Sequence, residues 1–111
     1  MHVEQTYNLG RAEAIRRIDA GVEELLQKDL PAGVAVTGFS KTWAEDTMRF
    51  SFTARKGFFG ATISGVVLVT EELVALDAEL PGVLTAFVPE AKIRENLQQE
   101  LGRILSAEGR G

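Results

Sequence analysis

The feature that most constrains this chain is an alternation of apolar and polar residues in its central part. In the stretch 47–55 (TMRFSFTAR), every second residue is apolar and the residues between them are polar. A period of two residues is typical of a β-strand with one buried face and one solvated face. The pattern therefore predicts a half-buried strand here, and we expect the stretches 58–70 and 73–80 to form the next two strands.

A pairing test supports one antiparallel sheet. If Lys56-Gly57 is a two-residue hairpin turn, the apolar pairs are Ala54 with Phe59, Phe52 with Ala61, Phe50 with Ile63, and Met48 with Gly65. If Glu71-Glu72 is the next turn, they are Val69 with Val74, Val67 with Leu76, Gly65 with Ala78, and Ile63 with Leu80. All of these pairs fall on one apolar face, and a slip of one residue would destroy that face.

The glycines of the stretch RKGFFGATISGVVLV raise the alternative of a phosphate-binding loop. Their spacing does not fit the G-x-x-x-x-G-K-[ST] pattern of such a loop. The pairing instead makes this stretch the central strand, with Gly57 in a turn that needs a positive φ. Gly65 would then face Met48 and Ala78 and leave room for a bulky helix side chain.

Two segments have the helical period instead. One follows a short strand at 2–8 and ends before the breaker cluster at 30–33; its stripe is Ile15, Ile18, Val22, Leu25 and Leu26, with Arg16, Arg17, Asp19, Glu23 and Glu24 on the other side. The other follows Pro81 and has a stripe of Leu84, Phe87, Val88, Ile93, Leu97, Leu101, Ile104 and Leu105. Pro89 would stand in the first turn of this helix or kink it.

With a further strand at 34–43, the predicted order is β-α-β-β-β-β-α. This is an α+β fold: a four- to five-stranded antiparallel sheet with two amphipathic helices on one face. We expect one domain over residues 1–111, with an ordered core at about 3–105 and a frayed tail at 106–111. The length of the loop at 44–47 is ambiguous, so the pattern leaves the face of Trp43 open.

Composition excludes several classes of function. The chain has no cysteine, so disulfides and thiolate zinc sites are excluded. Its formal net charge of -4 argues against nucleic acid as the main partner. The N-terminus lacks the apolar core of a signal peptide, and no apolar run approaches the roughly 20 residues of a transmembrane helix. The expected location is the cytoplasm.

The inventory of reactive side chains is small. His2 is the only histidine, at an exposed or frayed terminus, so no Ser-His-Asp or Cys-His arrangement can be built. An all-oxygen metal site could be proposed at Glu71-Glu72 or at Asp77 with Glu79, but solvated surface explains both pairs better. We therefore predict no catalytic residues, no metal and no cofactor.

The pairing predicts an unusual outer face of the sheet. Apolar residues cluster there at one end, namely Val66, Leu68, Leu73 and Ala75. Such a cluster is typical of a covered surface, and the cover could be a homodimer, a hydrophobic ligand, a polymer surface or an edge loop; ordinary exposed apolar area is the alternative. Arg49, Arg55, Lys56 and Lys41 are placed on or near this face, as a solubilising surface or for an anionic partner.

Several segments carry a family resemblance. They are LGRAEAIRRI (9–18), Trp43 with MRFSFTA (48–54), GATISGVVLVTEELVALDAELP (60–81) and the terminal apolar stripe at 93–105. In these the chain resembles the polyhydroxyalkanoic acid system family of small bacterial proteins. The resemblance implies a cytoplasmic, non-enzymatic accessory protein that acts at polyester granules or on their machinery, and it transfers no catalytic residues.

Two functions of different kind follow. In the first, an accessory protein contacts a granule or a granule protein through the outer patch or through Val83, Leu84 and Phe87 beside Val88. In the second, a shortened helix-grip fold carries a small acyl or lipid-like ligand in a cavity near Gly65. A third class, hydrolysis or isomerisation, is disfavoured by the residue inventory.

Overall fold

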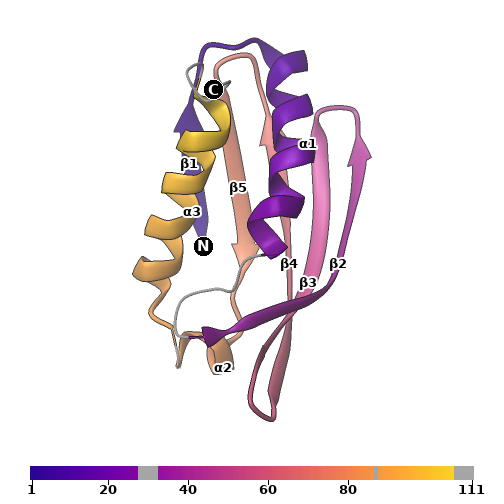
Figure 1. The fold of residues 1–111 in the computed structure, drawn as a ribbon. Coiled ribbons are helices and arrows are strands. Elements are labelled where there is room, and N and C mark those ends of the chain that lie inside the picture. Colours follow the sequence, from indigo (N-terminus) through magenta and orange to yellow (C-terminus); the bar gives the residue numbers. More distant parts are fainter. Residues whose placement is uncertain (28–32, 87, 107–111) are drawn as a thin grey trace.

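A computed structural model describes residues 1–27, 33–86 and 88–106. Five antiparallel strands form one sheet in the order β1-β5-β4-β3-β2, and helices α1 and α3 lie on one side of it (Figure 1). The elements are β1 (His2–Thr6), α1 (Arg11–Gln27), β2 (Ala35–Ala44), β3 (Thr47–Lys56), β4 (Phe59–Val69), β5 (Leu73–Glu79), α2 (Gly82–Thr85) and α3 (Glu90–Leu105). The predicted fold class is confirmed, and α2 is an additional short helix.

The C-terminal helix begins later than the apolar stripe alone suggested. Pro89 directly precedes α3, and its carbonyl oxygen accepts hydrogen bonds from Lys92 and Ile93. Proline suits this position because its fixed φ matches the helix and its missing N–H leaves no bond unmade. Pro89 therefore starts α3 rather than kinking a longer helix. In the predicted frayed tail, Ser106 is described as the C-terminal cap of α3, and the rest lies outside the described residues.

One apolar core fills the space between the sheet and the two long helices. Buried side chains alternate along β3, as the period of two predicted. Opposite them, Ala14 and Ile18 of α1 and Ile93, Leu101 and Leu105 of α3 are all buried. The face of the sheet turned away from the helices is called the outer face below.

The register of β4 against β5 is the predicted one, with Val69 opposite Val74 and Gly65 opposite Ala78. The predicted register of β3 against β4 is wrong by two residues, since Phe50 rather than Met48 lies opposite Gly65. The turn is Gly57-Phe58, not Lys56-Gly57, and Gly57 has a φ of 61°. Type II′ hairpin turns favour glycine at this first position. A slip of two residues keeps the same side chains on the inner face.

The space beside Gly65 is filled by a side chain of the neighbouring strand β3. A Cβ atom at this position would lie 2.7 Å from Phe50 Cζ and 2.5 Å from the Asp77 carbonyl oxygen. The ring of Phe50 thus occupies the space that a side chain at residue 65 would need. The expected bulky helix side chain does not appear in that space, because the shifted register brings a phenylalanine beside the glycine.

Replacing Gly65 tests this packing. We expect Gly65→Ala to lower the free energy of unfolding by about 1–3 kcal/mol, because the new methyl group overlaps backbone as well as a ring. Gly60→Ala in the same strand is the control: a Cβ atom there meets only the Arg55 side chain, at 3.8 Å or more. It should change stability by no more than about 0.5 kcal/mol. Urea denaturation measures both, and equal midpoints for the two variants would contradict the packing.

A β-bulge in β2 changes which side chains meet the helices. Two residues of β2, Gly38 and Phe39, stand opposite Phe52 of β3. Gly38 has a φ of 65°, the conformation that places glycine first in a bulge of this kind. Beyond the bulge, Lys41 and Trp43 lie opposite the buried residues Phe50 and Met48.

Trp43, whose face the sequence left open, therefore lies on the inner face as a packing residue. Its Nε1 donates to Asp19 Oδ1 of α1 at 2.7 Å. Lys41 was placed on or near the outer face, and this placement is wrong because the bulge reverses the alternation. Its Nζ lies 2.9 Å from Asp19 Oδ1 and 2.8 Å from Glu23 Oε2. The two side chains fasten α1 to an edge strand.

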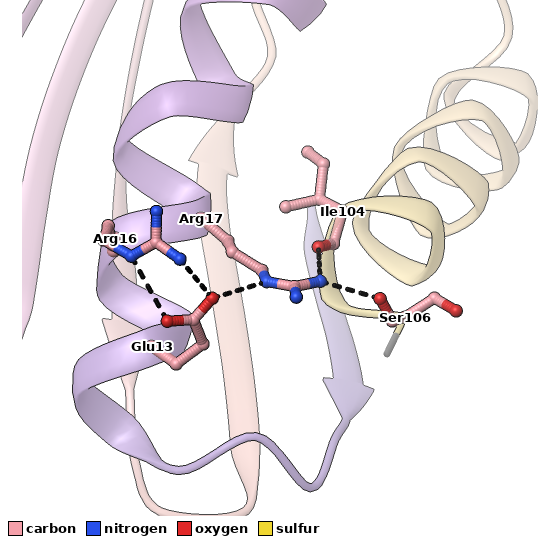
Figure 2. A network of polar contacts seen from close by, with 5 residues as sticks. All are labelled: Glu13, Arg16, Arg17, Ile104 and Ser106. Atoms are coloured by element: carbon pink, nitrogen blue, oxygen red, sulfur yellow. Dashed lines mark hydrogen bonds and ion pairs between the residues drawn. The ribbon is translucent and has the colours of Figure 1, made fainter. Parts of the chain in front are cut away.

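A second polar network joins the two long helices (Figure 2). Arg17 of α1 donates through Nη1 to the carbonyl oxygens of Ser106, at 2.7 Å, and Ile104, at 3.4 Å. These carbonyls end α3, where backbone acceptors lack helical partners and a positive charge is favourable. Glu13 holds the guanidinium from the other side at 2.9 Å. Arg17 was assigned to the wet side of α1; instead, this half-buried residue caps the neighbouring helix.

Arg16 provides a matched control for Arg17. Both side chains pair with Glu13, but Arg16 does not contact α3 and is 73 % exposed. We expect Arg17→Met to cost about 1–2 kcal/mol, because two carbonyls lose a charged donor. Arg16→Met should cost less than about 0.5 kcal/mol, as is usual for an exposed ion pair. Thermal or urea denaturation distinguishes them, and equal losses would show that Arg17 acts only through Glu13.

Candidate binding surfaces

The outer face of the sheet is the larger candidate surface. Figure 1 shows α1 and α3 on the opposite side. The register lines up two rows of hydroxyl side chains on it, Thr37-Thr53-Thr62 and Ser40-Ser51-Ser64. The Ser40 and Ser51 hydroxyls are 3.1 Å apart. This part of the sheet therefore carries hydrogen-bonding groups at regular spacing across neighbouring strands.

The four apolar residues predicted to point outward do lie together on this face; they are called the outer strip. Leu68 stands between Thr47 and Ala75 in register, and Val66 stands between Arg49 and Asp77. Leu73 lies opposite Thr6 of β1. Leu68 is 41 % exposed and the other three are half-buried. The outer strip is therefore accessible, and it adjoins the hydroxyl rows.

Charges of opposite sign flank the outer strip. On the β3 side is Arg49, which lies opposite Val66 in the register. Arg49 and Arg55, which lies further along β3 toward the Gly57-Phe58 turn, are the two arginines among the described residues that form no ion pair. On the β1 side, His2 lies 2.6 Å from Asp77 Oδ1 and 2.7 Å from Glu4 Oε2. The face is thus basic at one margin and acidic at the other.

His2 is exposed, as expected, but it is not frayed. It belongs to β1 and stands opposite Asp77 in the register. The hydrogen bond to Glu4 raises the pKa of the imidazole above its usual 6.5, and the hydrogen bond to Asp77 raises it further by a smaller amount. Protonated His2 therefore supports the attachment of β1 to β5.

The pH dependence of this attachment can be measured. Because the folded-state pKa of His2 is raised, its stabilising effect is complete below about pH 6.5 and is lost as the pH rises through the folded pKa. An NMR titration of the imidazole should give a pKa above 6.5. Glu4→Gln should move it back toward the ordinary value. An imidazole pKa at or below 6.5 in the parent protein would contradict the contact.

The second predicted contact segment, residues 83–88, contains both exposed and buried residues. Val83 is 38 % exposed, but Leu84 and Val88 are buried in the core, so Leu84 is wrong as a contact residue. Its place in α2 turns it toward the inner face of the sheet, where an apolar side chain is needed. Phe87 lies outside the described residues.

Sequence reasoning missed the tip of the β3–β4 hairpin. Phe58 is fully exposed and Phe59 is 55 % exposed, which makes them the most exposed large apolar residues described. The sequence did contain a signal for this turn. Two adjacent phenylalanines of a strand cannot both point to the buried face of the sheet, and Gly57 suits the first position of a type II′ turn. Placing the turn one residue too early had put Phe58 inside a strand.

A small apolar cavity lies between the sheet and the helices. It has a volume of about 50 Å³, and its described lining includes Val22, Phe50, Leu76, Ile93 and Leu97. Pockets for small organic ligands usually measure roughly 300–1,000 Å³. Within the described residues, no group of three or more His, Cys, Asp or Glu is placed to hold a metal ion. No helix in that part of the chain is long and apolar enough to cross a bilayer.

Together, these features define a small α+β protein whose described helices α1 and α3 cover one face of the sheet and leave the other face bare. The family described as "Putative polyhydroxyalkanoic acid system protein" matches residues 1–105, and the chain belongs to this family. The predicted resemblance is thereby confirmed. No curated protein and no solved structure gave a match.

Proposed function

We propose that this chain is a non-catalytic accessory protein of the polyhydroxyalkanoate system that binds the granule through its outer face. The family description links the chain to that system. The observation that carries the proposal is the bare sheet face, on which the outer strip adjoins two rows of hydroxyls. Both kinds of group match a storage polyester.

A polyester presents alkyl groups and ester carbonyls. Alkyl groups favour contact with exposed apolar side chains such as Leu68, since that contact removes both from water. Carbonyl oxygens accept hydrogen bonds from serine and threonine hydroxyls and from arginine N–H groups. Arg49 offers such donors directly beside Val66 and has no ion-pair partner among the described residues. A face with regularly spaced donors suits a repeating polymer.

The carrier of a small acyl ligand receives less support. The cavity between the helices and the sheet is several times smaller than a usual ligand pocket. Gly65 opens no cavity of its own toward the helices, because Phe50 fills the space beside it.

Replacing Leu68 and Leu73 by serine tests the proposal. We expect the double variant to lose most of its co-sedimentation with isolated granules, because two apolar contacts are removed, while its urea midpoint changes little. Ala12→Ser with Ala91→Ser is the control, since both alanines are exposed on the helices. Granule binding by the Leu68/Leu73 variant equal to that of the parent protein would contradict the proposal.

Sedimentation equilibrium of the same proteins separates granule binding from self-association. A monomer in both cases leaves the outer face available for the polymer, as proposed. A parent dimer that the Leu68→Ser/Leu73→Ser variant dissolves would assign the face to a second copy of the chain instead.

A further inference from the structure

The turn of the β3–β4 hairpin contains an aromatic residue, Phe58, that the fold does not require. Phe58 holds the second position of a two-residue turn, where polar residues and glycine are usual. It is fully exposed, so it contributes nothing to the core. Exposed aromatic side chains at such a position are typical of contact surfaces rather than of turn formation.

The hairpin tip also extends past the end of β5, whereas β2 accompanies β3 as far as Arg55. β5 pairs with β4 only from Ser64 onward, so Phe59–Ile63 extend past the end of β5. In Figure 1 the hairpin reaches further than α2 at the same end of the molecule. Val83 of α2, itself 38 % exposed, lines a shared hollow with Phe59 and Lys56. The protruding end is therefore apolar over more than one element.

Charge separates along the same axis. Residues 47–70 contain three basic residues, Arg49, Arg55 and Lys56, and none of the chain's 16 acidic residues, although the chain is acidic overall. The turns at the other end of these strands carry Glu45-Asp46 and Glu71-Glu72. The Val69 N–H, at the end of β4, donates a hydrogen bond to the Asp46 carbonyl oxygen of the first of these turns. One end of these strands thus carries four acidic residues, of which Asp46 and Glu71 pair with Arg11. The other end carries Arg55 and Lys56 beside the two phenylalanines.

We propose that the hairpin tip binds an anionic phospholipid surface by inserting Phe58 and Phe59 below the headgroups. Aromatic side chains bury their rings at such an interface, while nearby arginine and lysine remain at headgroup level with the anionic groups. Juxtaposed basic residues are attracted by anionic lipid, and this attraction weakens with salt. The acidic turns face away from the lipid in this orientation. This surface is distinct from the outer strip.

Sedimentation with sucrose-loaded vesicles tests the proposal. The parent protein should bind vesicles of phosphatidylglycerol and phosphatidylcholine in equal parts, and should bind pure phosphatidylcholine much more weakly. Phe58→Ser should lower the partition coefficient about tenfold or more, because one buried ring is lost. Arg55→Gln should lower it about fivefold. Leu68→Ser removes an equally apolar side chain from the outer strip and should leave lipid binding unchanged.

Fluorescence gives a second readout that does not depend on affinity. Trp43 is half-buried near the acidic turns, so the parent emission should not shift when vesicles are added. Phe58→Trp places an indole in the tip, and its emission should shift to the blue with anionic vesicles.

Three results would overturn the proposal. They are absence of parent binding to anionic vesicles, a Phe58→Ser variant that binds as well as the parent, and equal Phe58-dependent binding to lipid-free polyester particles. Because granule binding is tested with Leu68 and Leu73 and lipid binding with Phe58, failure of one proposal leaves the other intact.

Discussion

The structure depends on two tight turns that hold three strands in one register. Two residues, Gly57-Phe58, join β3 to β4, and three residues, 70–72, join β4 to β5, so the apolar side chains of β3, β4 and β5 all point the same way. That shared face buries Ala14 and Ile18 of α1 together with Ile93, Leu101 and Leu105 of α3. A register slip of one residue in either hairpin would turn polar side chains inward and leave the helices without a surface to pack on.

Polar contacts then fix where each helix lies on that apolar surface. Arg17 ties α1 to the end of α3, and Asp19 ties α1 to Lys41 and Trp43 of β2. Apolar burial alone is not directional, whereas these bonds require particular atoms to meet. Within the described residues, the outer face carries no comparable network with a helix.

Sequence periodicity predicted which residues face the core but not every pairing between strands. The alternation in β3 has a period of two, so it distinguishes registers that differ by one residue but not registers that differ by two. The correct register depends on the position of Gly57, which is the first residue of the turn. The bulge at Gly38 could not be inferred, because the residues around it mix polar and apolar types. The bare outer strip was predicted from the same alternation, whereas the hairpin tip was hidden by the misplaced turn.

The bulge in β2 also bears on how copies of this protein can associate. β2 is one edge of the sheet and β1 is the other. Open edges invite strand-to-strand addition, which natural proteins prevent with bulges, inward-pointing charges and short edge strands. Here one edge has Gly38 and the inward-pointing Lys41, and the other is only five residues long. Growth of the sheet into a continuous fibre is therefore disfavoured at both edges, although the face between them stays open.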